Sequence, residues 1–296
     1  GRTIHSVLKP YPDKPGFRHT PDNPLLADLV IIDEASMIDI VLMTRLLEAV
    51  PDTSQLVMLG DRHQLSSVQA GAVFSDICDC HPANGSVFYL DYNFRSKGKS
   101  GIEALSNAVK LMQADNVVRL LTQHVYPEIE FIDLKHDDAA STINQSISDH
   151  ILLWGNQSDP QDLVSGMDAF KILCAHNTGP MGTLSINHIC ENILRSSQNS
   201  DTLSAQFNRI IMIKKNDYEK DLLNGDTGVI ITRPNEQAVY FNSEDNQLRK
   251  LRPADLPEHD TAFAITVHKS QGSEYDRVMI LIPDKISPVI TRELLY

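Results

Sequence analysis

The chain has 296 residues, a hydrophobic content of 42% and a charged content of 22%, which is ordinary for a soluble globular protein with room for two domains. It contains neither an apolar run approaching the roughly 20 residues that span a bilayer nor an amino-terminal signal pattern, so we expect a cytoplasmic protein without a membrane partner. A formal net charge of −13 argues against wholesale electrostatic binding to nucleic acid, although a local basic groove is compatible with it.

The four cysteines are too few and too scattered for a disulfide framework. The string Cys78-Asp79-Cys80-His81 lacks a second ligand pair at zinc spacing, so zinc is disfavoured. The chain starts without a methionine and stops inside a predicted helix start, so we expect a piece of a longer protein.

The predicted elements of the first part alternate between strands and helices. Residues 10–24 are rich in Pro, Asp and Gly and predict a turn-laden excursion. A buried strand at 29–32, a helix that starts at an Asp39 cap and a second strand at 55–59 predict a right-handed crossover unit. Further along, the pattern predicts a helix over 70–79, a strand over 86–90 and a helix over 101–112.

The second part of the chain predicts another α/β block that is interrupted by short strands. Ile143, Ile147, Ile151 and Leu152 form an apolar stripe that is typical of a surface helix. A strand at 170–175 and a helix at 181–194 follow, and the α/β pattern resumes with strands at 261–266 and 277–283. The short strands between 209 and 259, separated by turns, predict a small β-barrel insert.

Two adjacent acids, Asp33 and Glu34, directly follow the first buried strand. Carboxyl ends of parallel strands are where open α/β sheets bind ligands, although such acids also often precede a helix cap, here Ser36 or Asp39. Gln64 follows the next strand, so the two loops should converge. Nucleotide hydrolysis needs a Mg²⁺ held partly by an Asp, a group that orients water and a contact to the γ-phosphate, which fits these three residues.

The motif order resembles that of the superfamily 1 DNA helicases. DEAS (33–36) is followed by GDRHQL (60–65), YNFRS (92–96) and ITVHKSQGSEYD (265–276). Within that superfamily the sequence in and around these motifs resembles the RecD family, the α subunits of exodeoxyribonuclease V (RecBCD enzyme). NPLLADLVIIDEASMID, LLNGDTGVI and PVITRELLY carry this likeness, which is weakest from about 97 to 168. The segment before the YNFRS motif is shorter than the family usually has.

The resemblance implies ATP and Mg²⁺ as cofactors and a role for each matching residue. Asp33 would bind Mg²⁺, Glu34 would position or deprotonate water, Gln64 would sense the γ-phosphate, Arg95 would be an arginine finger, and Glu274 would contact the ribose. The implied DNA-binding residues are Thr3, His5, Thr266, His268, Lys269, Ser270 and Gln271.

Ordinary structural roles compete with several of these assignments. Arg95 could form a helix-start ion pair, His268 and Lys269 could lie on a solvated helix face, and His5 has no supporting pattern of its own. Asp61 is expected to brace its turn and not to bind metal.

The phosphate loop GxxxxGK[ST] that the family carries upstream of Thr3 does not occur in these 296 residues. The string Asn93–Ser100 ends in GKS, but it has Asn where the first Gly belongs and follows the arginine motif, so we interpret it as a basic turn before a helix. The family's last, arginine-containing motif would start at about Tyr296. We therefore expect these residues alone to hydrolyse ATP poorly or not at all.

The resemblance implies an α/β fold of two RecA-like P-loop NTPase-type domains, the first one truncated, with an SH3-like β-barrel insert in the second. The expected ranges are 1–110 for the first motor domain, with a hairpin at 10–24 that meets the duplex fork, 111–168 for a connecting helical segment, 169–208 and 260–296 for the second motor domain, and 209–259 for the insert.

The function implied is the motor portion of an ATP-dependent 5′-to-3′ DNA helicase in double-strand break repair and recombination. Its expected partners are single-stranded DNA, duplex DNA ends and RecB- and RecC-like subunits, and the exonuclease activity would belong to the complex. A stand-alone RecD-like helicase and a degenerate motor retained as a scaffold are the alternatives. The intact Asp33, Glu34, Gln64 and Arg95 speak against a scaffold.

Overall fold

Two parallel strands joined by a crossover helix organise the first part of the chain. The computed structural model describes residues 2–65, 71–80, 86–90, 100–134, 139–197, 208–233, 236–243, 247–285 and 287–296. The chain forms two compact units, Gly1–Phe131 together with Thr291–Tyr296, and Ile132–Ile290. Among the described residues no helix combines the length and the apolar character needed to cross a membrane.

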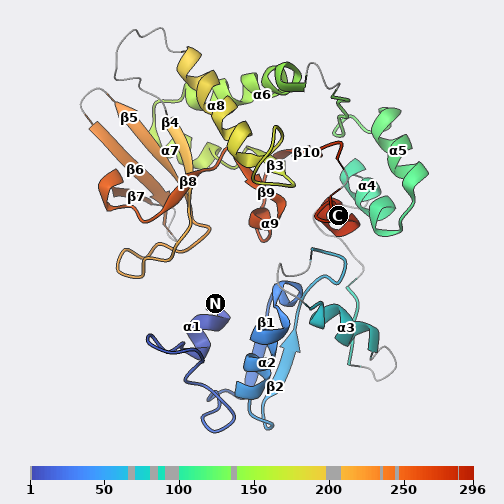
Figure 1. Cartoon of the computed structure of the whole chain (residues 1–296), viewed down its shortest axis with the longest axis vertical. Coiled ribbons are helices and arrows are strands. Elements are labelled where there is room, and N and C mark those ends of the chain that lie inside the picture. The colour runs from blue at the N-terminus through green and yellow to red at the C-terminus, as the bar shows by residue number, and fades with distance from the viewer. Residues whose placement is uncertain are drawn as a thin grey trace. The chain divides into compact units, whose positions relative to one another are not determined.

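The first unit holds a two-stranded parallel sheet with α2 lying along it (Figure 1). Its elements are α1 (Ile4–Leu8), β1 (Leu29–Ile32), the 3-10 helix η1 (Ala35–Met37), α2 (Ile40–Ala49), β2 (Gln55–Met58), α3 (Val73–Cys80), α4 (Gly101–Lys110), α5 (Ala114–Thr122) and α10 (Arg292–Leu295). The predicted strand–helix–strand unit is confirmed, and β1 pairs with β2 from Leu29↔Gln55 to Ile32↔Met58.

Packing of α1, α2 and α3 builds the core of this unit. Buried side chains from all three helices, Leu8, Met43, Leu46 and Phe74, surround Ile32 at the end of β1. Because the last residue of β1 is anchored in this core, the residues that follow it have a fixed position at the sheet edge.

The strand predicted over 86–90 is not formed. These residues have no regular secondary structure, and Phe88 and Leu90 are 82% and 93% exposed. An apolar run becomes a strand only if a neighbouring strand pairs with it, and none of the strands that the structure describes pairs with this run.

The second unit contains a three-stranded parallel sheet, in the order β10-β3-β9, and a five-stranded antiparallel sheet, in the order β7-β6-β5-β4-β8. Its elements are α6 (Ala139–Gly155), α7 (Pro160–Gly166), β3 (Phe170–Cys174), α8 (Thr183–Ser197), β4 (Asn208–Ile213), β5 (Thr227–Arg233), β6 (Glu236–Asn242), β7 (Leu248–Leu251), η2 (Pro253–Asp255), β8 (His259–Thr261), β9 (Ala264–Thr266), α9 (Val267–Ser270) and β10 (Arg277–Leu281).

Side chains of β4 alternate between two cores. Ile210 and Met212 pack into the main core with α6, α8 and β3, whereas Ile211 and Ile213 face a second core on the other side of the antiparallel sheet. Burial on both faces explains why this strand is a continuous apolar run. In the part of the chain that the structure describes, β7 and β8 are the edges of this sheet, so closure into an SH3-like barrel stays a prediction.

Of two expectations for this unit, one agrees with the structure and one differs from it. The stripe of Ile143, Ile147 and Ile151 is buried in the main core, where α6 packs against α8 (Figure 1), while Asn144 and Asp149 on the other face are exposed, as expected for a surface helix. The run 261–266, predicted as one strand, divides between the two sheets: Thr261 pairs with Ile211, and Ala264 pairs with Ile172.

Candidate functional site

The ends of β1 and β2 lie side by side and continue their pairing beyond the strands. The Leu59 amide donates to the Ile32 carbonyl at 2.8 Å, and the Ala35 amide donates to the Leu59 carbonyl at 2.8 Å. These two hydrogen bonds bracket Asp33 and Glu34, so the acid pair is held at the carboxyl edge of the sheet, as the sequence predicted.

Both acids are exposed, and the backbone at Glu34 has an uncommon conformation. Glu34 has φ 51° and ψ 42°, in the left-handed region that costs a non-glycine residue about 1–2 kcal/mol. The Glu34 amide donates to Oδ1 of Asp33 at 2.9 Å. The two side chains therefore leave the sheet edge from a sharp turn, with their remaining carboxylate oxygens open to solvent.

Helix capping does not account for this pair. Asp39 is the N-cap of α2, because its Oδ1 accepts a hydrogen bond from the Leu42 amide at 2.9 Å. Ser36 follows the acids and is only 7% exposed, and its Oγ lacks a hydrogen-bond partner among the described residues. A buried hydroxyl without a partner next to two carboxylates is a polar group that a ligand at this edge could satisfy.

The loop after β2 is braced by hydrogen bonds and by α3. The Asp61 carboxylate accepts from the His63 amide at 2.9 Å, which confirms the expected turn-bracing role, and the Gln64 amide donates to the Asp61 carbonyl at 3.2 Å. From α3, Asp79 forms an ion pair with Arg62 at 2.8 Å, and Ser75 donates to the Arg62 carbonyl at 3.1 Å. The half-buried Gln64 thus sits in a fixed loop at the strand end next to the acid pair.

The same loop contacts the end of the chain within the first unit. The Tyr296 hydroxyl donates to Oδ2 of Asp61 at 2.9 Å, and burial together with this carboxylate raises the pKa of Tyr296 to about 12. Burial and the nearby charges of Lys110 and Arg62 lower the pKa of His63. His63 therefore favours its neutral form at neutral pH.

Thr3 and His5 lie at the start of the chain, on α1. Thr3 is the N-cap of this helix, and its Oγ1 accepts from the Ser6 amide at 3.2 Å. The exposed His5 ring packs edge-on against Phe17, with centroids 5.5 Å apart. Thr3 thus has a structural role that the sequence pattern alone did not reveal.

The segment 266–271 forms the end of β9 and the short helix α9. Thr266 is the N-cap of α9, where its Oγ1 accepts from the Lys269 amide at 3.4 Å, and Ser270 Oγ donates to the Val267 carbonyl at 2.8 Å. His268 is half-buried, and this burial lowers its pKa, whereas Lys269 is exposed. Gln271 ends the helix, and the exposed Glu274 follows in the next loop.

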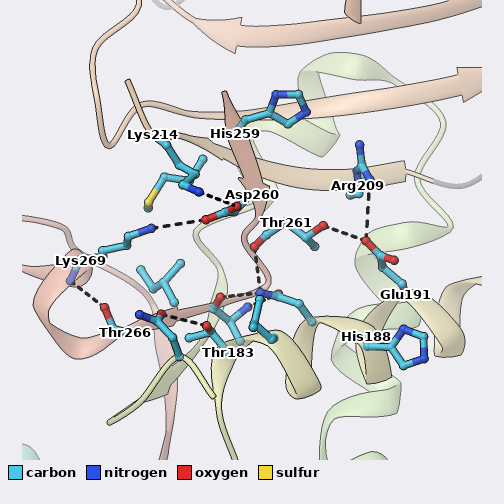
Figure 2. Close-up of a pocket in the computed structure, with 16 residues that line it drawn as sticks. Thr183, His188, Glu191, Arg209, Lys214, His259, Asp260, Thr261, Thr266 and Lys269 are labelled. Atoms are coloured by element: carbon cyan, nitrogen blue, oxygen red, sulfur yellow. Dashed lines mark hydrogen bonds and ion pairs between the residues drawn. The ribbon is translucent and has the colours of Figure 1, made fainter. Parts of the chain in front are cut away.

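A pocket of about 750 Å³ lies in the second unit, beside Thr266 and Lys269 (Figure 2). Its walls come from α8, from β4 and β8 of the antiparallel sheet and from the β9–α9 junction. Polar and charged side chains dominate the lining: Asn177, Thr183, Asn187, His188, Glu191, Arg209, Lys214, His259, Asp260, Thr261, Thr266 and Lys269.

Ion pairs organise two parts of this pocket, as Figure 2 shows. Asp260 lies between Lys269, at 3.8 Å from Oδ2, and Lys214, at 3.5 Å from Oδ1. On the other part, Glu191 accepts from the Thr261 hydroxyl at 2.8 Å and pairs with Arg209 at 3.9 Å. The pocket thus combines several cations with carboxylates that partly neutralise them.

Sequence reasoning missed the pocket residues outside the helicase-like motif. Asp260, Lys214 and Glu191 come from three elements far apart in the chain, so no spacing brings them together. Only the position of Lys214 directly after the apolar run of β4 carried a signal, because a charge that ends a buried strand often lies at the sheet edge.

The arginine motif and the basic string that overlaps it can be placed only in part. Arg95 and most of the Asn93–Ser100 string lie outside the described residues. Ser100 is the N-cap of α4, with its Oγ accepting from the Glu103 amide at 3.1 Å, which agrees with a turn before a helix.

The remaining cysteine and metal expectations concern α3 and the described residues as a whole. Cys78 is buried, and burial raises the pKa of its thiol. Within the ranges that the structure describes, no group of three or more His, Cys, Asp or Glu residues has a metal-binding arrangement.

The fold and the motif order resemble those of the superfamily 1 DNA helicases. Residues 1–127 match the AAA domain family, and residues 261–296 match the UvrD-like helicase C-terminal domain family. The Pif1 helicase from Bacteroides, in a structure with ADP-AlF3 and single-stranded DNA, aligns with 100% of this chain and 76% of its own, with a TM-score of 0.51 and 17% identity. The expected α/β fold of RecA-like helicase domains is thereby confirmed.

Among curated proteins the chain is similar to RecD. The RecBCD enzyme subunit RecD of Mycolicibacterium smegmatis is 31% identical over 299 residues, which cover 99% of this chain and 52% of the relative. The ATP-dependent RecD2 DNA helicase of Deinococcus radiodurans is 24% identical over 297 residues, which cover 99% of this chain and 38% of the relative. The predicted resemblance to RecD-like helicases is confirmed, and the chain spans about half the length of the RecD subunit.

Proposed function

We propose that this chain is the motor portion of an ATP-dependent 5′-to-3′ DNA helicase, the α subunit of a RecBCD-type exodeoxyribonuclease V that acts in double-strand break repair and recombination. The observation that carries the proposal is the acid pair Asp33–Glu34, held at the end of β1 beside the β2 loop that bears Gln64. Adjacent strand ends with two carboxylates and an amide suit nucleotide hydrolysis better than a scaffold role.

The residues at this edge fit a bound ATP with Mg²⁺. Carboxylate oxygens are the ligands that Mg²⁺ prefers, and the two exposed acids and the buried Ser36 hydroxyl offer polar groups to such a ligand. Bound Mg-ATP would supply the γ-phosphate for transfer to water. Asp33 would hold the metal, Glu34 would orient the water and take its proton, and Gln64 would contact the γ-phosphate.

We propose nucleotide contacts for two further residues of the chain. Arg95, outside the described residues, would supply a guanidinium to the γ-phosphate, and the exposed Glu274 would contact the ribose. The phosphate-cradling GxxxxGK[ST] sequence does not occur in these 296 residues.

The proposed DNA contacts lie on two segments. Thr3 at the N-cap of α1 and His5 on α1 are exposed, and Thr266, His268, Lys269, Ser270 and Gln271 occupy the β9–α9 junction. Lys269 is suited to neutralise a backbone phosphate, because its ammonium group is exposed at the polar pocket. Single-stranded DNA and duplex DNA ends are the proposed substrates, and RecB- and RecC-like subunits are the proposed partners.

A stand-alone helicase is the second candidate. The relative from Deinococcus radiodurans is named an ATP-dependent RecD2 DNA helicase, and it matches 99% of this chain. The higher identity to a protein named as a RecBCD subunit favours the first candidate. Co-purification of the full-length protein with RecB- and RecC-like subunits would distinguish the two.

The test is DNA-stimulated ATP hydrolysis and unwinding of 5′-tailed duplex DNA by the full-length protein carrying Glu34→Gln. Loss of a general base should lower kcat by roughly 10² or more and abolish unwinding, whereas binding of single-stranded DNA should persist. Glu48→Gln is the matched control, because Glu48 is an exposed glutamate on α2 that pairs with Arg45 at 2.9 Å. Unchanged hydrolysis in Glu34→Gln would contradict the role of Glu34.

A further inference from the structure

Asp260 connects two lysines that belong to different parts of the second unit. Lys269 lies on α9, which follows the parallel sheet, and Lys214 follows β4 of the antiparallel sheet. Each lysine pairs with a different oxygen of the same carboxylate, at 3.8 Å and 3.5 Å (Figure 2). The Asp260 carboxylate therefore forms ion pairs with both ammonium groups on the side of the pocket that Lys214 and Lys269 line.

The backbone of Asp260 is fixed by the antiparallel sheet. Asp260 is in register with Met212 of β4, and the neighbouring residue Thr261 is held through its hydroxyl by Glu191. The backbone of Lys214 is also held, because its amide donates to the Glu258 carbonyl at 2.8 Å. Strand pairing fixes the Cα of Asp260, so its carboxylate stays tethered beside both ammonium groups.

The charges on this wall balance. Lys214 and Lys269 face Asp260 and Glu258, and Glu258 pairs with Lys214 at 2.7 Å. These carboxylates raise the pKa of Lys214, so it stays protonated. A phosphate that approaches Lys269 meets an ammonium group that is already 3.8 Å from a carboxylate oxygen of Asp260, so the two anions compete for the attraction of the same positive charge.

We propose that Asp260 is an affinity-determining residue that competes with the backbone phosphates of single-stranded nucleic acid for Lys269 and Lys214. This inference rests on the proposed function, because it assigns the pocket beside the β9–α9 junction to the DNA strand. A competitor that is tethered beside the lysines keeps the phosphate contact weak and readily reversed. A motor that advances along a strand needs such reversibility, because each contact must break in every step.

The experiment measures the Kd of full-length Asp260→Asn for a fluorescent oligothymidylate by anisotropy, without nucleotide, across a salt series. Asparagine has nearly the same shape as aspartate but carries no charge. The Asp260 side chain is 45% exposed, so we expect the variant to fold. We expect binding roughly fivefold tighter than wild type at low salt, with the gain shrinking as salt rises. Equal or weaker binding would overturn the proposal.

Glu258→Gln is the matched control, because it removes a carboxylate that pairs with Lys214 but not with Lys269. Glu258→Gln should increase the affinity for the oligothymidylate less than Asp260→Asn does. An equal increase in affinity would overturn the proposal in favour of a nonspecific charge effect. In a Lys269→Ala background the gain from Asp260→Asn should fall by at least half, since one of the two contested cations is gone. A gain of unchanged size there would also count against the proposal.

Failure of the proposed function gives a different result from failure of this inference. If the wild-type protein does not bind the oligothymidylate, both the proposed function and the role of Asp260 are wrong. If wild type binds and Asp260→Asn binds no tighter, only the role of Asp260 is wrong.

Discussion

The side-chain amide of Asn187 forms hydrogen bonds with both the backbone amide and the backbone carbonyl of Ala264. Nδ2 donates to the Ala264 carbonyl at 2.9 Å, and Oδ1 accepts from the Ala264 amide at 2.8 Å. Nδ2 also donates to the Thr261 carbonyl at 2.8 Å. Asn187 of α8 thus fixes the two-residue crossing from the antiparallel sheet to the parallel sheet, immediately before the Thr266–Gln271 segment.

Asn187→Ala should destabilise the second unit by about 2–4 kcal/mol, because it leaves the buried polar groups of Ala264 without their side-chain partner. Urea unfolding followed by fluorescence measures this effect, since the only tryptophan, Trp154, is buried in the core of this unit. The control is Asn177→Ala, at an exposed position in the same pocket, which should change stability little. Equal effects of the two substitutions would contradict the bridging role.

Lys171→Met should stabilise the second unit by on the order of 2 kcal/mol at neutral pH. The Lys171 side chain is fully buried on β3, where burial lowers its pKa from the ordinary 10.5 to about 8. Its ammonium group donates to the Ala262 carbonyl at 3.3 Å and lies 3.9 Å from Asp168, which is a weak compensation for desolvation.

The pH dependence of this effect has a definite sign. Below pH 8 the lysine is charged in both the folded and the unfolded chain, so the desolvation cost is present in full. Between about 8 and 10.5 the folded protein loses this proton while the unfolded chain keeps it, so the wild-type contribution becomes less unfavourable as pH rises. The advantage of Lys171→Met, measured by urea unfolding, should therefore shrink across this window; an advantage independent of pH would refute the assignment.

Gly228→Ala should lower the stability of the antiparallel sheet by about 1–3 kcal/mol. A Cβ at this position would lie 2.7 Å from the Phe241 ring and 2.8 Å from the Tyr240 carbonyl oxygen, so β5 and β6 would have to separate. The thermal midpoint of unfolding reports the loss. Thr227→Ala at the adjacent position is the control, and a larger effect there would show that the close approach at Gly228 is unimportant.

Lys269→Ala should weaken binding of single-stranded DNA and reduce the slope of log Kd against log salt by roughly 0.7, the value for one phosphate contact on a single strand. The exposed Lys285 provides the control, because it is a lysine of the same unit outside the pocket. A salt slope unchanged by Lys269→Ala would mean that this ammonium group does not contact a phosphate.

Regular local patterns made much of the fold predictable. The run LVII followed by Asp39 and a helical apolar period predicted β1, α2 and its cap, because strand burial, capping and helical spacing are encoded within a few neighbouring residues. The same logic failed at Phe88, where an apolar run pairs with none of the described strands. It also failed between Thr261 and Ala264, where one predicted strand serves two sheets.

The sequence by itself determined the acid pair after a buried strand, the order of the helicase-like motifs and the alternation of strands and helices, since each is a local property of the chain. Only the tertiary structure decided that Glu34 takes a left-handed backbone and that Asp260 lies between Lys214 and Lys269. The contacts of Asp260 join the end of β4 to a helix that lies far along the chain from it. Such pairs arise from packing of separate elements, and no sequence spacing specifies them.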